Sequence, residues 1–198
     1  IKLRLLENHD DPRFAMKVRD PLALQSWTAF MNWLPGAMLL YAGQELAVGR
    51  DREVGSRGQE HYHRERHDVP WDRGDADLAD FVRRLLDYMH HVKRACRVCH
   101  VSEVTRGVVR IDWRSPAKAC TAIVNLENRF GGVEVPWSLH GRDVLTGERV
   151  EIERHLQIQH RPIILDLEPH TAPAAVTPGE VFSLHGGANW AAAGVNMA

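Results

Sequence analysis

Two short apolar runs, with a helical pattern between them, define the first part of the chain. The runs are "LRLL" at 3–6 and "AMLLYAGQE" at 37–45; neither alternates, as in strands buried on both faces, and each ends in polar residues. Between them, Asp-Pro at 20–21 predicts the start of a helix, apolar side chains continue at helical spacing, and Pro-Gly at 35–36 predicts its end. The order strand, helix, strand predicts a βα unit followed by the strand of a second unit.

A long helix and a series of short strands follow a polar loop at 46–75. Apolar residues recur at helical spacing and predict one buried stripe: Leu78, Phe81, Val82, Leu85, Leu86, Met89 and Val92. From about Gly107 the period changes, and short apolar runs separated by turns predict antiparallel strands. These runs are 107–113, 121–126, 133–137, 149–153 and 162–167, with "LTGE" at 145–148 as a turn. We expect this separate β domain to pack on the helix face that carries Phe81, Leu85 and Met89.

Composition and charge exclude several classes of protein. The chain has 198 residues, 44% of them hydrophobic, which is enough for one sizeable core or two small domains of a soluble globular protein. A formal net charge of −1 leaves no basic surface for nucleic acid, and no apolar stretch is long enough for a membrane span. Three cysteines favour a reducing, cytoplasmic compartment over a disulfide framework. The chain starts at Ile1 without methionine or a signal peptide, so we expect it to be part of a longer chain.

The first predicted strand ends in a group of ionisable residues, "ENHDDPR" at 7–13. Charged residues at the end of a strand commonly form a solvated turn. In α/β barrels, however, side chains at the carboxyl ends of the strands build the active site, and both predicted strands end in polar groups. A solvated turn and an active site are both consistent with this pattern.

Four segments resemble the α-amylase superfamily, glycoside hydrolase family 13, in the same order and spacing. "LLENHDDPR" (5–13) resembles its strand-seven motif, in which Asn-His-Asp follows an apolar run, and "LPGAMLLYAGQE" (34–45) resembles its eighth strand. "HDVPWDRGDADLADFVRRLL" (67–86) resembles the segment before the last barrel helix, and the β-rich stretch to about Leu167 resembles the C-terminal all-β domain. The resemblance implies an α/β plus all-β fold. Its parts are a C-terminal fragment of a (β/α)8 TIM barrel at 1–100, an antiparallel β-sandwich domain at 104–168, and a disordered, Ala/Pro/Gly-rich tail at 169–198.

The resemblance also implies roles for the charged residues. Asp10 matches the carboxylate that stabilises the transition state, while His9 and Asn8 match residues that bind the sugar. Arg13 matches an arginine that, in some members, pairs with an acid holding the non-reducing end of the substrate, and Asp11 tunes the cleft. Retaining glycosidases also need a nucleophile and an acid/base carboxyl, which in this family lie on earlier strands. The implied complete enzyme cleaves α-linked glucosyl bonds in α-glucans or maltooligosaccharides without a cofactor, although calcium is frequent in the family.

Several alternatives remain open at the level of sequence. One is a transglycosylase of the same superfamily, trehalose-forming or sucrose-using, and another is a non-catalytic carbohydrate-binding or structural module. "CRVCH" at 96–100 fits the Cys-x-x-Cys-His pattern of covalent haem attachment, or two buried thiols at a domain junction. His63 and His67 have the spacing for zinc on a helix, although neighbouring arginines favour a solvated loop. Trp113 and Trp137 fit a β core better than a platform for sugar rings.

The resemblance leads to three further expectations. The side chains of His9 and Asp10 are expected to point into the open end of the partial barrel, on the same side as Gln44 and Glu45. The chain alone is expected to be inactive, because one carboxylate without a nucleophile or a proton donor cannot cleave a glycosidic bond. Two barrel strands also bury too little apolar surface to hold the first 95 residues stably.

Overall fold

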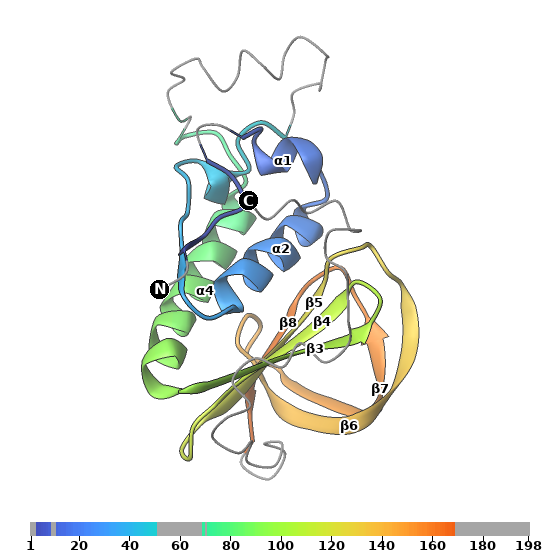
Figure 1. Cartoon of the computed structure of the whole chain (residues 1–198). Coiled ribbons are helices and arrows are strands. Elements are labelled where there is room, and N and C mark those ends of the chain that lie inside the picture. The colour runs from blue at the N-terminus through green and yellow to red at the C-terminus, as the bar shows by residue number, and fades with distance from the viewer. Residues whose placement is uncertain (1–2, 9–10, 51–68, 70, 169–198) are drawn as a thin grey trace.

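A computed structural model describes residues 3–8, 11–50, 69 and 71–168 of the chain. Figure 1 shows two parts that lie against each other, a group of helices and a curled β-sheet. His9 and Asp10, the histidines of the zinc-type pair and the C-terminal tail lie outside the described residues. The expectations for these residues therefore stay predictions.

The two long helices predicted from the sequence are present. In each helix an aspartate at the N-cap accepts a hydrogen bond from a main-chain N–H of the first turn, Asp20 in the first helix and Asp75 in the second. Two short elements accompany them, one turn of α-helix and one of 3-10 helix. The helical elements are α1 (Phe14–Lys17), α2 (Pro21–Trp33), η1 (Gln44–Leu46) and α4 (Ala76–Ala95).

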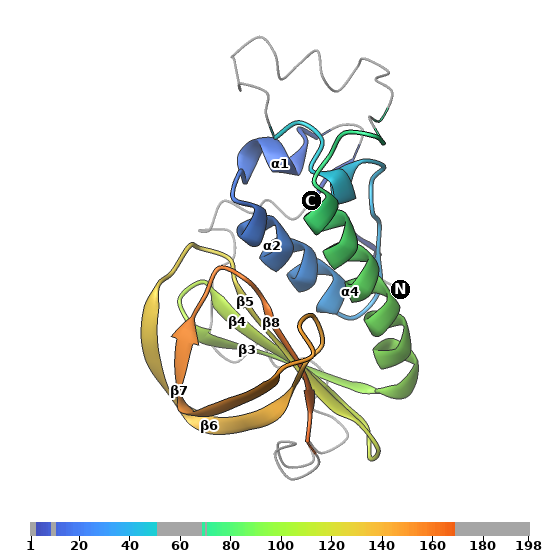
Figure 2. The ribbon, with the colours of Figure 1, turned by 180° about the vertical axis from the view of Figure 1, so that it is seen from behind.

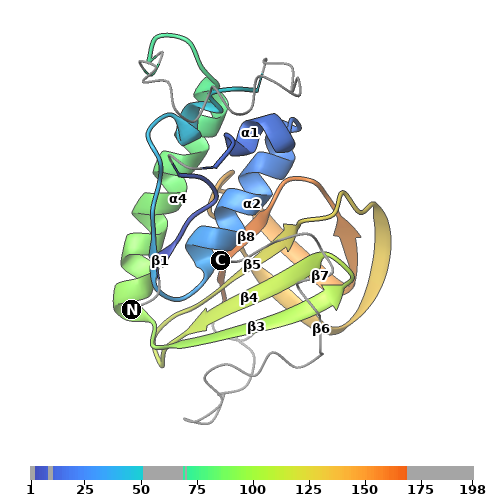
Figure 3. The ribbon, with the colours of Figure 1, turned by 45° about the horizontal axis from the view of Figure 1, so that its top comes forward.

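The two N-terminal strands pair in parallel, as predicted, but they are short. β1 (Leu3–Arg4) pairs with β2 (Ala37–Met38), and Figure 3 shows β1 beside α4. Burial of this strand, predicted for the complete barrel, stays a prediction, and in the described chain Leu3 is 60% exposed. The physical reason is that β1 has a single neighbouring strand among the described residues, and a two-stranded sheet covers little surface.

Six antiparallel strands form one continuous sheet in the order β3-β4-β5-β8-β6-β7. They are β3 (Val98–Thr105), β4 (Val108–Arg114), β5 (Ala119–Asn125), β6 (Gly131–Asp143), β7 (Arg149–Ile158) and β8 (Ile163–Leu167). The sheet curls so that β6 and β7 lie opposite β4 and β5 (Figure 1). The predicted antiparallel strands are confirmed with two corrections: they share one curled sheet instead of two stacked ones, and β3 was not predicted.

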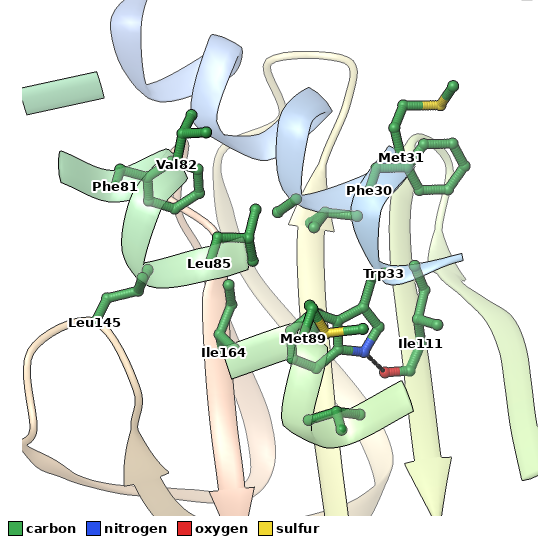
Figure 4. Packing of buried hydrophobic residues seen from close by; sticks show 14 of the residues in the cluster. Phe30, Met31, Trp33, Phe81, Val82, Leu85, Met89, Ile111, Leu145 and Ile164 are labelled. Carbon is green, nitrogen blue, oxygen red and sulfur yellow. Dashed lines mark hydrogen bonds between the residues drawn. The ribbon is translucent and has the colours of Figure 1, made fainter. Parts of the chain in front are cut away.

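Two hydrophobic clusters lie on the opposite faces of this sheet. One fills the inside of the curl: Val108, Ile123, Val135, Leu139, Ile152, Leu156, Ile158 and Leu165. The other lies between the outer face of the sheet and the helices α2 and α4 (Figures 2 and 4). The predicted burial of Phe81, Leu85 and Met89 is confirmed, because these side chains are 6%, 1% and 2% exposed within this second cluster. The helices and the sheet therefore share a core.

One position of the predicted helical stripe was wrong. Leu86 is 38% exposed, whereas its neighbour Leu85 is 1% exposed. Consecutive residues of an α-helix are separated by about 100° around the axis, so when Leu85 points at the sheet, Leu86 points away from it. The buried stripe of α4 is correspondingly narrower than the sequence indicates.

Candidate functional site

Asn8 and Asp11 close a tight turn a few residues after β1. The Asn8 side-chain amide donates to Asp11 Oδ2 at 2.8 Å, and the Asp11 main-chain N–H donates to Asn8 Oδ1 at 3.1 Å. These two bonds bring the ends of the turn together in the way that Asx side chains commonly do. In the sequence, His9 and Asp10 stand between these two residues, and the predicted chemistry is assigned to them.

Glu7, immediately before this turn, is a buried carboxylate with both oxygens engaged. Its side chain is 1% exposed, and Oε1 accepts a hydrogen bond from Arg13 Nη1 at 2.7 Å. Oε2 accepts from the Phe14 main-chain N–H at 2.5 Å. Burial raises the pKa of Glu7 above its ordinary value of 4.5, although the hydrogen bonds from Phe14 and Arg13 act in the opposite direction. The Glu7 side chain thus links the start of the turn to Arg13 and Phe14, which follow the turn.

The Arg13 side chain connects this turn to the segment that follows β2. Besides its ion pair with Glu7, Nη1 donates to the Ala42 carbonyl at 2.8 Å. The guanidinium carbon lies 4.6 Å from the centre of the Tyr41 ring, within the range of a cation–π contact. The residues that follow the two parallel strands are therefore held together by one arginine. This is the edge at which α/β barrels place their active sites.

The inner side of this group is closed. A cavity of about 10 Å³ lies beside Glu7, with room for about one water molecule. Gln44 lines the same cavity and is 8% exposed, so its side chain faces inward beside Glu7. Glu45 accepts a hydrogen bond from the Gly43 main-chain N–H at 3.1 Å. The described residues here can hold a turn in place but leave no room for a sugar on this inner side.

The Arg13 side chain is 11% exposed and is engaged by Glu7, Ala42 and Tyr41. Its predicted role in substrate binding stays a prediction. Sequence reasoning missed Glu7 and Tyr41 as members of the site. A glutamate that closes an apolar run six residues before an arginine was an available signal, but the contact with Tyr41 depends on the parallel pairing of the strands.

The Cys-x-x-Cys-His segment belongs to the core. Cys96 ends α4 and is 1% exposed, and Cys99 on β3 is 4% exposed. Burial raises the pKa of the Cys99 thiol to about 12, which keeps it protonated and unreactive. Both thiols are packed inside the cluster that α4 and the sheet share, so the buried-thiol interpretation is favoured over haem attachment.

The two tryptophans of the sheet are also core residues. Trp113 is 7% exposed and lies in the cluster under the helices. Trp137 is partly buried against the inner cluster, and the Arg110 guanidinium lies 4.5 Å from the centre of its ring. Trp113 is therefore closed inside the core, and Arg110 covers one face of the Trp137 ring.

Metal and membrane sites were also considered for the described residues. Within them, no group of three or more His, Cys, Asp and Glu side chains gathers closely enough to hold a metal ion. None of the helices in the same part of the chain combines the length and the apolar character needed to cross a bilayer.

Comparisons with known proteins point to one group of enzymes. No family model matches the chain. Alpha-amylase MalA of Haloarcula japonica is 31% identical over 150 residues, which are 72% of this chain and 20% of that protein. Alpha-amylase 2 of Dictyoglomus thermophilum is 29% identical over 87 residues, 43% of this chain and 16% of that protein. The crystal structure of an alpha-amylase from Lactobacillus plantarum has a similar fold, with a TM-score of 0.65 and 22% identity over 83% of this chain and 38% of that one. The chain therefore spans about a fifth or less of the curated relatives that it matches.

Proposed function

Because the chain resembles the C-terminal portion of α-amylases in both sequence and fold, we propose that the complete protein is a retaining glycoside hydrolase acting on α-glucans. The observation that carries this proposal is the edge formed by β1 and β2. Polar residues lie a few positions beyond each of two parallel strands, and Arg13 links the segments after the two strands. The Asn-His-Asp sequence lies in the turn at this edge.

In this proposal β1 and β2 are the seventh and eighth strands of a (β/α)8 barrel. The parallel pairing and the intervening helix α2 are those of a βα unit. The exposure of Leu3 supports the same assignment, since a barrel strand is covered by neighbours on both sides and by helices outside. Residues 1–100 then belong to the barrel and 104–168 to the C-terminal β domain, with 169–198 as a tail.

Asp10 is proposed as the stabiliser of an oxocarbenium-like transition state. The covalent step of a retaining glycosidase needs a nucleophilic carboxylate and a second carboxyl that protonates the leaving oxygen; both are proposed to come from other parts of the complete protein. A further carboxylate beside the sugar ring favours the positive charge that develops there. His9 and Asn8 are proposed to bind the hydroxyls of the same sugar, with maltooligosaccharides as the substrate class.

The test is to incubate the complete protein with maltoheptaose and to follow the products by proton NMR. Retention predicts that the α-anomer of the new reducing end appears first and then mutarotates. Longer oligosaccharides without net hydrolysis would instead identify a transglycosylase. Absence of any conversion would contradict the proposed activity and favour a non-catalytic module.

A further inference from the structure

The segment around Glu7 contains a buried ion pair whose position suggests a role in the geometry of the site. We infer that Glu7 is a positioning residue, which acts through Arg13 to hold the turn between Asn8 and Asp11 against the segment after β2. This inference rests on the proposed function, because it concerns the placement of the groups that would act there.

The first argument is the way the carboxylate spans the turn. Glu7 lies at the entrance of the turn, and both of its oxygens bind groups at the exit, Arg13 Nη1 at 2.7 Å and the Phe14 N–H at 2.5 Å. The Asn8–Asp11 bonds close the turn inside this outer bridge. The described residues on both sides of the motif are thus held by two nested sets of bonds.

The second argument is the connection across the strands. Arg13 also contacts the segment that follows β2. Its Nη1 donates to the Ala42 carbonyl at 2.8 Å, and its guanidinium lies over the Tyr41 ring. Gly49 makes room for this arrangement, since a Cβ at this position would lie 3.1 Å from Arg13 Cβ, and its φ of +98° is one that other residues rarely adopt. The turn is therefore fixed relative to both strands.

The third argument concerns energy. Bringing two charges out of water costs free energy that their attraction only partly offsets, so a buried ion pair contributes little net stability compared with apolar groups of the same size. A supporting group that fixes the geometry of an active site has a different effect, because small displacements of reacting groups lower the rate strongly. The Glu7 side chain is 2% exposed and the Arg13 side chain 11% exposed, so each mainly contacts described residues.

The experiment uses the complete enzyme with Glu7→Gln or Arg13→Lys, assayed on maltoheptaose well below the melting temperature of each variant. We expect kcat to fall by about 10- to 100-fold for Glu7→Gln, with KM within about twofold, since a misplaced turn impairs the transition state more than ground-state binding. Arg13→Lys keeps the positive charge and is expected to retain more activity than Arg13→Gln. The Glu7→Gln/Arg13→Gln double variant is expected to lose little more than the worse single variant, because both changes break one bridge.

Matched controls are Asp87→Asn and Arg83→Lys, which alter an ion pair on the exposed side of α4. They are expected to keep kcat within about twofold, as surface pairs contribute little. If Glu7→Gln fails to fold, the changes in kcat and KM are compared for Arg13→Lys instead.

Three outcomes would overturn the inference. An unchanged kcat with a lower melting temperature would show a purely stabilising pair. A raised KM for Arg13→Lys beside a normal Glu7→Gln would show that Arg13 binds substrate. An inactive wild-type enzyme would overturn the proposed function itself, whereas the first two outcomes leave that function intact.

Discussion

The indole N–H of Trp113 donates a hydrogen bond to the main-chain carbonyl of Trp33 at 2.6 Å. The indole of Trp33 in turn donates to the Ile111 carbonyl at 3.0 Å (Figure 4). These reciprocal bonds join the end of α2 to β4 inside the shared core, where an unpaired polar group would be costly. The helical part and the sheet are therefore linked by directional bonds as well as by apolar contacts.

We predict that Trp113→Phe lowers the free energy of unfolding by about 2–4 kcal/mol, because it leaves the buried Trp33 carbonyl without its partner and removes core volume. The measurement is urea denaturation of the complete protein followed by circular dichroism. The control is Trp71→Phe, a residue that is 65% exposed, for which we expect a change below about 0.5 kcal/mol. Equal effects of the two substitutions would contradict the role of the bond.

The N-cap of α4 predicts a pH-dependent contribution to stability. Asp75 accepts from the Leu78 N–H at 2.8 Å and pairs with Arg50 at 2.5 Å. Burial acts to raise the pKa of Asp75, but these bonds outweigh it and hold the pKa below its ordinary value of 3.8. A carboxyl with a lowered folded-state pKa stabilises the protein above its unfolded-state pKa, and this stabilisation is lost as the pH falls through the folded-state value.

We therefore expect Asp75→Ala to destabilise the protein by about 1 kcal/mol at pH 7, with a smaller difference from wild type below pH 3.8. Denaturant titrations between pH 7 and pH 3 measure this difference. Asp87→Ala, at a carboxylate that is 72% exposed on the same helix, serves as the control and should show little effect at either pH. If the loss of stability caused by Asp75→Ala instead became larger as the pH falls, the lowered pKa assigned to Asp75 would be contradicted.

For the proposed chemistry, we predict that Asp10→Asn in the complete enzyme lowers kcat by at least about 100-fold, which corresponds to about 3 kcal/mol of transition-state stabilisation. Ground-state binding should change less, because the developing positive charge is absent before the reaction starts. His9→Ala should impair both kcat and KM, since an imidazole that binds sugar hydroxyls acts in both states. Initial rates on maltoheptaose test both variants, with Asp87→Asn as the charge-matched control. A near-native kcat for Asp10→Asn would refute the role assigned to Asp10.

The helices could be predicted from the sequence because their signals are local. An aspartate followed by proline marks the start of α2, and an apolar stripe marks α4. The strands were harder, since their extent depends on partners that are distant in the chain. β1 has two residues where four were predicted, and β3 was overlooked because polar residues such as His100 and Ser102 interrupt its apolar run at a sheet edge.

The candidate site was predictable only in part, for the same reason. The turn after the first strand could be located from its sequence, and Asn8 and Asp11 do lie together there. The partners of Arg13 could not be identified, because Tyr41 and Ala42 reach it only through the parallel pairing of two strands. The substrate-binding role predicted for Arg13 stays a prediction, while its contacts with Glu7, Tyr41 and Ala42 became visible only in the fold.

The burial of the cysteine pair predicts slow chemistry at Cys99. Its raised pKa of about 12 and its 4% exposure together keep the thiolate fraction and the access of reagents low. We expect alkylation of Cys99 by iodoacetamide at pH 8 to be at least about 100-fold slower in the native protein than after unfolding in urea. Peptide mapping by mass spectrometry measures the rate, and the unfolded protein is its own control. Fast alkylation of the native protein would show that the thiol is open, as haem attachment would require.

The shared core changes what we expect of residues 1–198 when they are made alone. From the sequence, all of the first 95 residues were expected to be unstable without the rest of a barrel. In the structure, however, α2 and α4 bury their apolar faces against the sheet, so their stability is tied to that of the β domain. The segment 3–8 has no comparable support, since Leu3 is 60% exposed and β1 consists of two residues with one neighbouring strand.

We therefore predict that amide exchange of the isolated chain is slow in β4, β5 and the buried face of α4, and fast at residues 3–6. In the complete enzyme the same four residues should become protected, because the proposed barrel supplies the missing neighbour of β1. The isolated chain should release no reducing sugar from maltooligosaccharides, since Asp10 can stabilise charge but neither attacks the sugar nor protonates the leaving oxygen. Exchange followed by mass spectrometry and a reducing-sugar assay test both statements. Strong protection of residues 3–6 in the isolated chain, or clear turnover, would show that this chain is a self-sufficient unit and that the proposed barrel assignment of β1 is wrong.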